Sequence, residues 1–290
     1  MASLKELKNK INVINSTRKV TSAMKLVAGV KLRKAEQKAN SSRSYATELN
    51  KILSRLNREL LEINSEMFNG RKNIKNEMLI VFSSDRGLCG NFNYLINKEV
   101  ARLVDDFHED GKNVHIICVG NKAFSPLKKI IGDADYIELE DGFYHSKEIV
   151  ESSLVLARKA IEYFNSNLVD RISAVYTRSY SALKREVELK ELLPIKCELD
   201  NDKSITVFEP SVDEIINELV PYNLGIQIYQ TALESMTSEQ SSRMTSMDNA
   251  TRNADSILSE LKIKYNRTRQ YKITQELTEV ISGADAIAEG

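Results

Sequence analysis

Residues 4–63 read LKELKNKINVINSTRKVTSAMKLVAGVKLRKAEQKANSSRSYATELNKILSRLNRELLEI, a stretch that contains no proline and one glycine, Gly29. Residues 226–282 contain neither residue type. All four prolines and eight of the eleven glycines lie in the interval from Gly70 to Gly225. A helix of about 60 residues is roughly 90 Å long, whereas a compact chain of this length has a radius of gyration of about 19 Å. The sequence therefore predicts two terminal helices that leave the globule and pair with each other.

A seven-residue repeat runs through the first stretch in one register and indicates a left-handed coiled coil. Its positions are Leu4, Leu7, Ile11, Ile14, Arg18, Thr21, Lys25, Ala28, Leu32, Ala35, Ala39, Ser42, Ala46, Leu49, Leu53, Leu56, Leu60 and Ile63. Leucine and isoleucine dominate both ends of this seam, while its middle is first polar and then small. Small residues allow close approach but bury fewer methylene groups, each of which contributes about 0.8 kcal/mol.

The C-terminal stretch carries a matching repeat for about five heptads. Its predicted seam is Ile226, Tyr229, Leu233, Met236, Gln240, Arg243, Met247, Ala250, Ala254, Ile257 and Leu261. Beyond Leu261 the phase slips, so we expect the helix to run on without a register-matched partner. Ile273, Leu277 and Val280 form a new stripe there, and Gly283 predicts the end of the helix.

The middle of the chain alternates between strand and helix patterns, which indicates βαβ units around a mainly parallel sheet. Predicted strands span residues 78–83, 114–119, 172–176 and 185–192, and predicted helices span 93–108, 122–131 and 146–165. The fold class is therefore α/β, with a Rossmann-like central domain and a long antiparallel coiled coil. We expect three parts: an N-terminal coiled-coil helix at 1–65, a globular domain at 66–210 and a C-terminal coiled-coil helix at 211–290.

Composition excludes several classes of protein. A hydrophobic content of 42% and a charged content of 28% exclude a disordered chain. No apolar run approaches the 18 residues of a membrane span, and the N-terminus lacks a secretory signal, so we expect mature structure there. Three isolated cysteines and three scattered histidines predict reduced thiols and no metal site. The acidic residues between Asp133 and Asp141 match no calcium loop and predict a solvated loop.

Charge is unevenly distributed although the whole chain is neutral. Residues 1–40 hold eight Lys and two Arg against two Glu, a local balance of +8, so the rest carries −8. Such a basic end favours an acidic partner. The first aromatic residue is Tyr45, so nothing in this stretch can stack on bases, and we expect no nucleic-acid partner. A solvated helix face explains the charge as well as any one partner does.

One local motif, SSDRGLCGNFN at residues 83–93, lies directly between a predicted strand and a predicted helix. Phosphate-binding loops occupy such positions, because a helix N-terminus faces the anion. The motif has two glycines and no lysine, so it matches neither standard phosphate-loop pattern. A conformationally demanding turn is the favoured interpretation, and a nucleotide-binding α/β protein with a coiled-coil stalk is the alternative. No base is evident for Cys89, which predicts a packed or half-exposed thiol and not a nucleophile.

Three polar segments fall where a coiled coil would favour apolar residues: 17–28, 242–254 and 265–277. Ser, Thr and Asn weaken helix interiors, so a poorly optimised seam is one interpretation. The alternative is that these segments face a partner. The runs INSTRKVTSAMKLVA at 14–28, SEQSSRMTSMDNATRNA at 238–254 and YNRTRQYKITQEL at 265–277, together with the central SSDRGLCGNFN, resemble the gamma subunits of F-type ATP synthases over the whole chain, in order.

This resemblance implies a rotor shaft without catalytic, cofactor or metal sites of its own. It implies that the paired helices turn inside a ring of alpha and beta subunits, coupling proton flow through the c ring to ATP synthesis or hydrolysis. The implied partners are the alpha, beta and epsilon subunits and the c ring. The implied location is peripheral, on the cytoplasmic side of the cell inner membrane. Chloroplast-type gamma subunits carry a regulatory cysteine pair, whereas this chain has Cys197 alone in that neighbourhood.

The same resemblance assigns the partner contacts. The family's contact positions with the beta subunits fall on Met24, Arg243, Gln270, Thr274 and Glu276. Their neighbours Lys19, Lys25 and Arg269 are expected on the same surface. Glu209, which precedes Pro210, resembles the foot segment that contacts the c ring and epsilon.

Overall fold

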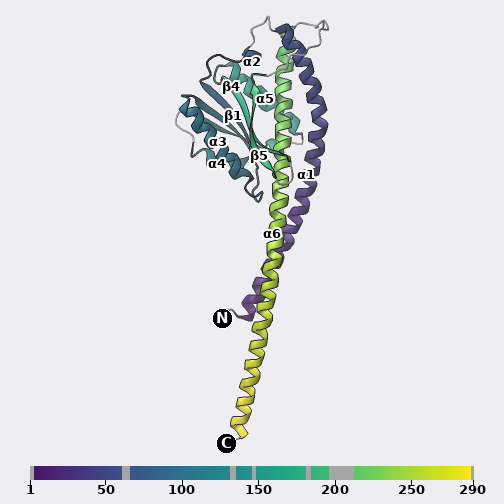
Figure 1. Cartoon of the computed structure of the whole chain (residues 1–290), viewed down its shortest axis with the longest axis vertical. Helices are drawn as coiled ribbons and strands as arrows, with labels where there is room; N and C mark the ends of the chain where they lie inside the picture. The colour runs from purple at the N-terminus through teal and green to yellow at the C-terminus, as the bar shows by residue number, and fades with distance from the viewer. Residues whose placement is uncertain are drawn as a thin grey trace. The chain divides into compact units, whose positions relative to one another are not determined.

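The computed structural model describes residues 3–60, 66–130, 135–145, 148–180, 184–195 and 212–288. Two long helices, α1 (Leu4–Leu60) and α6 (Val212–Ala288), begin and end the described chain (Figure 1). Packing divides the chain into two units, one made of residues 1–28 and 244–290 and the other of residues 29–243. We call the first the terminal unit and the second the body. Both chain ends therefore belong to the same unit, as the proline-free stretches predict.

The body is built on a five-stranded sheet in the order β3-β2-β1-β4-β5. The first four strands in this order are parallel, and β5 is antiparallel to β4. The strand bounds are β1 Asn76–Phe82, β2 Asn113–Val119, β3 Tyr136–Glu140, β4 Arg171–Ser179 and β5 Arg185–Leu193. The helices between them are α3 Phe92–Glu109, α4 Asn121–Leu127 and α5 Ile149–Asn165, with short turns of helix at α2 Glu66–Asn69 and η1 Phe143–His145. The Rossmann-like α/β prediction is confirmed.

Strand β3 was missed by the sequence prediction, which placed a solvated acidic loop there. Tyr136–Glu140 pairs in parallel with β2, and Glu138 is held 3.0 Å from Lys159 Nζ of α5. The strand is only five residues long and lies at the sheet edge, where one wet face tolerates charge. The sequence prediction therefore missed this strand because of its acidic residues, although apolar and acidic residues alternate along it from Ile137 to Glu140, as in an ordinary strand.

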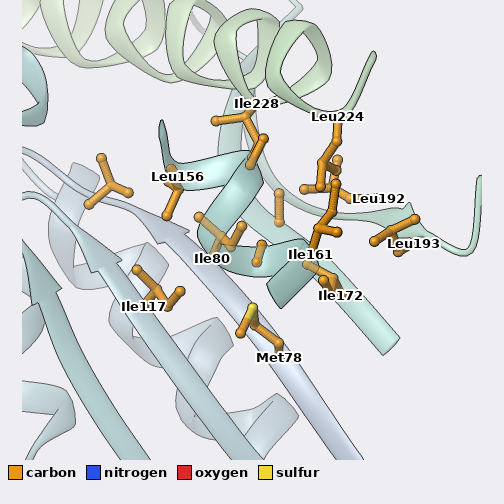
Figure 2. Close-up of a cluster of buried hydrophobic side chains, with 14 of the residues drawn as sticks. Met78, Ile80, Ile117, Leu156, Ile161, Ile172, Leu192, Leu193, Leu224 and Ile228 are labelled. Atoms are coloured by element: carbon orange, nitrogen blue, oxygen red, sulfur yellow. The ribbon is translucent and has the colours of Figure 1, made fainter. Parts of the chain in front are cut away.

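Alternate residues of β1 point to opposite faces of the sheet, each of which is covered by helices. Leu79 and Val81 belong to the apolar cluster shared with α3 and α4. Met78 and Ile80 belong to the cluster shared with α5 and the first part of α6. Figure 2 shows Leu224 and Ile228 of α6 above Leu156, Ile161 and Ile80 in this second cluster. Helix α6 is therefore part of the core of the body before it reaches the terminal unit.

Two helices approach very closely within this core. A Cβ atom added at Gly225 of α6 would lie 2.6 Å from a methyl carbon of Leu154 in α5. Glycine at this position removes the side chain that would hold α6 away from α5. The single glycine in this part of α6 thus serves packing and does not end the helix.

The heptad seam predicted for α1 is confirmed at every position whose side chain the structure describes. These positions are all buried or half-buried, with Leu7, Ala28, Ala35, Ala46, Leu49 and Leu53 the most buried. In the body, Ala46 and Leu49 pack against Ile226 of α6. Ring contact between Tyr45 and Tyr222, at 6.2 Å between centroids, lies beside this cluster. The repeat thus faces α6, as a coiled-coil seam does.

Past Met247, the register predicted for α6 is confirmed at Ala254 and Leu261 but is wrong at Ile257. Ile257, placed in the seam, is 43% exposed, whereas Leu258 is 7% exposed. Past Met247, the buried or half-buried positions are Asp248, Ala250, Thr251, Ala254, Leu258, Leu261, Tyr265 and Thr268. A heptad runs through the last six of them. The predicted seam contained Ala250 and left out Thr251, whose hydroxyl hydrogen-bonds that of Thr21 across the helix pair. A polar pair therefore sets a register that apolar counting misses.

The end of α6 also differs from the prediction. The seam continues one heptad beyond Leu261, to Thr268, and residues 269–284 are all exposed. The helix passes through Gly283 and ends at Ala288. Glycine in a helix interior costs only about 1 kcal/mol relative to alanine, which is not enough to end a long helix by itself.

Candidate partner-binding surface

Three polar contacts join α1 to α6 in the terminal unit. They are Arg18 Nη1–Asp255 Oδ1 at 3.2 Å, Thr21 Oγ1–Thr251 Oγ1 at 2.8 Å and Lys25 Nζ–Asp248 Oδ1 at 2.7 Å. The partner's number falls as the α1 number rises, so the two helices run antiparallel. The polar residues in the middle of the predicted α1 seam therefore each form a hydrogen bond or an ion pair with a residue of α6.

Asp248 is the most connected residue of this set. Lys25 and Arg252 both contact its carboxylate, at 2.7 and 2.9 Å. The hydrogen bond from Lys25, together with the positive charge of both neighbours, lowers the pKa of Asp248 below its ordinary value and outweighs the opposing effect of desolvation. The carboxylate is therefore ionised at neutral pH. The sequence analysis did not predict that Asp248 and Asp255 pair with α1. Acidic residues near the α6 seam, opposite a basic α1, could have indicated these ion pairs.

The predicted contact residues on α1 are accessible to different degrees. Lys19 is exposed, Met24 is half-buried and Lys25 is held by Asp248. A row of exposed valines lies on another face of α1, at 13, 20 and 27, each between 56% and 63% exposed. The surface of α1 in the terminal unit therefore combines positive charge with apolar side chains, a composition typical of interfaces.

The predicted contact residues near the end of α6 all lie in its exposed part. Arg269, Gln270, Thr274 and Glu276 are all exposed. Their contacts are local to the helix, such as Thr274 Oγ1 donating to the Gln270 carbonyl at 3.0 Å and Lys272 Nζ at 3.7 Å from Glu276. The stripe expected at Ile273, Leu277 and Val280 is between 48% and 69% exposed. An amphipathic helix with no apolar face covered is suited to insertion into a partner.

Arg243 differs from the other predicted contact residues because it is 9% exposed and lies in the body. Its guanidinium donates to the carbonyls of Arg86 and Gly87 in the turn between β1 and α3, and pairs with Glu239 at 2.6 Å. The neighbouring Ser242 hydroxyl donates to the Cys89 carbonyl at 2.7 Å. Sequence reasoning did not connect these segments, which are more than 150 residues apart.

The turn at 83–91 is filled by its own polar side chains. Ser84 and Asn93 hydrogen-bond each other, and the Asn93 amide donates to Cys89 Sγ at 3.3 Å. Leu88 and Gly90 take positive φ angles of 64° and 62°. Cys89 is 1% exposed. The structure thus agrees with a demanding turn that holds a packed thiol.

Other candidate chemistry is limited in the described ranges. Burial raises the pKa of the Cys118 thiol to about 12, which keeps it protonated and unreactive. No cluster of three acidic, histidine or cysteine residues in those ranges could hold a metal ion. None of the helices described here is long and apolar enough to cross a membrane. Glu209 and Cys197 lie outside the described residues.

Comparison with known proteins gives one consistent result. A family model described as ATP synthase matches residues 3–287. The chain is 36% identical to the ATP synthase gamma chain of Rhodospirillum rubrum, over 99% of this chain and 100% of that one. It is 38% identical to the ATP synthase gamma chain of Paramagnetospirillum magneticum, again over 99% and 100%.

Solved structures agree with the fold. The rotor of the Euglena gracilis mitochondrial ATP synthase matches with a TM-score of 0.59 and 16% identity, over 93% of this chain and 98% of that chain. The central stalk/c-ring structure of the Tetrahymena thermophila mitochondrial ATP synthase matches with a TM-score of 0.57 and 22% identity, over 80% and 99%. At these identities the likeness shows a shared fold, and the closer sequence relatives show the family.

Proposed function

This chain belongs to the ATP synthase gamma-chain family, and we propose that it is the central rotor shaft that couples proton flow to ATP synthesis or hydrolysis. In this proposal the shaft performs no catalysis itself. It turns with the c ring, and its asymmetric surface drives the catalytic sites of the alpha and beta subunits through their states. The proposal also locates the complex at the cell inner membrane, with this chain peripheral on the cytoplasmic side.

The observation that carries the proposal is the end of α6. Its last heptads leave the α1 seam at Thr268, and sixteen following residues, 269–284, are exposed yet helical. A helix of this kind is rarely stable alone in water, so its apolar stripe favours a surrounding partner. The sleeve formed by alpha and beta subunits is the partner that the family offers.

The proposed contacts with that sleeve are Lys19, Met24, Lys25, Arg243, Arg269, Gln270, Thr274 and Glu276. Seven of them lie in the terminal unit, which pairs both chain ends, and Arg243 lies in the body. The basic charge of α1 suits acidic loops on the beta subunits. Glu209 is proposed to contact the c ring and epsilon.

Reconstitution tests this function directly. The chain alone should hydrolyse no ATP, and adding it to alpha and beta subunits should markedly change their ATP turnover. A chain truncated after Thr268 is the matched control, because it keeps the described helix seam but lacks the exposed end. Turnover that is the same with and without the full chain would contradict the proposal.

A further inference from the structure

Helix α6 is tied to the turn between β1 and α3 by directional polar contacts. Ser242 Oγ donates to the Cys89 carbonyl at 2.7 Å. Arg243 Nη2 donates to the Arg86 carbonyl at 3.0 Å and the Gly87 carbonyl at 3.3 Å, and Nε reaches the Gly87 carbonyl at 3.4 Å. Both side chains are nearly buried, at 3% and 9% exposed. Two successive α6 residues therefore hold three carbonyls of one turn.

A buried carboxylate supports the arginine. Glu239 lies one helical turn before Arg243, with Oε1 2.6 Å from Nη2 and about an eighth of its side chain exposed. Burial raises the pKa of Glu239, and the Arg243 guanidinium acts against this rise. Lys31 of α1 and Asp85 of the turn also act on this carboxylate. The pair fixes the guanidinium in the orientation that its two carbonyl partners need.

The turn itself is held firmly to the sheet. Ser83 N donates to the Val119 carbonyl at 2.8 Å, and Ser83 Oγ donates to the Gly120 carbonyl at 2.9 Å. A Cβ atom at Gly120 would lie 2.3 Å from the Ser83 carbonyl oxygen, so the two loops are in close contact. A force applied to the turn is therefore passed to β1 and β2.

The position of these contacts along α6 suits them to resist rotation of the helix about its own axis. Upstream, α6 meets the rest of the body through apolar side chains such as Leu224 and Ile228 and through single hydrogen bonds such as that of Ser235 Oγ to the Phe82 carbonyl at 3.3 Å. Apolar contacts are non-directional, whereas hydrogen bonds depend strongly on angle. Arg243 is the last residue of the body, and Met244 is the first residue of α6 in the terminal unit. A twist arriving along α6 from the terminal unit thus meets, at Arg243, hydrogen bonds to the turn at 83–91.

We propose that Ser242, Arg243 and Glu239 form a torsional latch that prevents α6 from rotating about its own axis against the body. These three are positioning residues, and the idea rests on the proposed rotor function. It assigns Arg243 a role inside the chain, in addition to the contact with the sleeve proposed above. The latch makes α6 turn together with the turn at 83–91 and the sheet to which that turn is held.

The test uses the complete reconstituted ATP synthase in vesicles and measures ATP-driven proton pumping per ATP hydrolysed. Ser242→Ala, Glu239→Gln and Arg243→Gln should each lower this ratio, and Arg243→Lys should restore part of it. The matched control is Ser256→Ala, since the Ser256 hydroxyl bonds only its own helix, at the Arg252 carbonyl. The Ser242→Ala and Arg243→Gln losses should not add, because both act through one turn.

A second measurement separates a latch from general damage. Amide hydrogen exchange in residues 86–91 should speed up about fivefold in Ser242→Ala, the effect expected when a hydrogen bond of ordinary strength is lost. Exchange in α5 should stay unchanged, which shows that the body remains folded.

The outcomes are distinguishable from failure of the rotor function. If Arg243→Gln impairs pumping while Ser242→Ala and Glu239→Gln do not, Arg243 acts on the sleeve directly and the latch is wrong. If exchange at 86–91 is unchanged in Ser242→Ala, the latch is also wrong. If the unaltered chain fails to change turnover on reconstitution, the rotor proposal itself fails.

Discussion

The two ends of α6 contain the same kinds of residues in opposite surroundings. Leu224 and Ile228 near its start are fully buried against the sheet and α5, whereas Leu277 and Val280 near its end are 58% and 69% exposed. Both pairs lie at spacings that place them on one helix face. The amphipathic pattern therefore shows which face of α6 is apolar and suited to packing, but it does not show which surface that face packs against. The first part finds its partner in the same chain, and the last part is left for another.

The largest effect is expected from shortening a buried leucine of α6. Leu224→Ala should destabilise the chain by roughly 2–5 kcal/mol, because it removes buried methyl groups and leaves a cavity. Leu277→Ala, the same change on the same helix, should alter stability by no more than about 0.5 kcal/mol. Urea unfolding of the isolated chain measures both. Equal losses would mean that the end of α6 packs on the chain itself.

A smaller loss of stability is expected from replacing Asp170 by Asn. The Asp170 carboxylate accepts hydrogen bonds from the backbone of Lys75 and Asn76 and pairs with Arg71 at 3.0 Å. Burial alone would raise the pKa of Asp170, but these bonds outweigh it and the pKa is lowered below 3.8. Asp170→Asn should cost about 1–3 kcal/mol at neutral pH, since the donors lose a charged acceptor.

The pH dependence follows from the sign of that shift. A lowered carboxyl pKa stabilises the folded chain fully above its unfolded value of 3.8, and this stabilisation is lost as pH falls below it. The difference between the unaltered chain and Asp170→Asn should therefore shrink under acid. Glu276→Gln, on the exposed end of α6, is the control and should change stability little at any pH. A difference that stays constant down to pH 2 would contradict this account of Asp170.

Charge reversal in the polar seam should affect coupling more than folding. Lys25→Glu places a carboxylate against Asp248, but both groups are at the surface, where ion pairs contribute little to stability. In reconstituted vesicles, proton-driven ATP synthesis should fall while the unfolding midpoint of the isolated chain moves little. Lys19→Glu is the matched control for charge without an ion pair across the helices. Normal synthesis in both variants would count against these contact assignments.

The smallest effect on the isolated chain is expected from removing residues 269–290. Residues 269–284 are exposed throughout, so their loss should leave the unfolding midpoint nearly unchanged. The same truncation should impair function in the assembled complex, where we propose that they contact the sleeve. A clear drop in the midpoint would show that this segment stabilises the chain without a partner.

Much of the fold could be predicted because its signals are local and periodic. The α1 repeat is strict over the whole described seam, and the buried strands read as continuous apolar runs. Strand β3 could not be found this way, since an edge strand with acidic residues resembles a loop. The α6 register past Met247 was right only in part: Ala254 and Leu261 are confirmed, but Thr251, which hydrogen-bonds Thr21 across the helix pair, was left out.

Part of the candidate site could likewise be predicted from the sequence, and part could not. Exposure of Arg269, Gln270, Thr274 and Glu276 agrees with a surface that faces outward, and their polar character was visible in the sequence. The burial of Arg243 was not visible, because its carbonyl partners at Arg86 and Gly87 carry no side-chain signal.

By itself, then, the sequence determined that two long helices pair and that an α/β body lies between them. Repeats of seven and of two residues report which face of an element is apolar, and that is enough for this conclusion. Only the tertiary structure decided which α6 residues meet α1, where that pairing ends at Thr268, and that Arg243 is tied to the turn after β1. Those choices depend on hydrogen bonds between residues more than 150 positions apart, whose geometry exists only once the chain has folded.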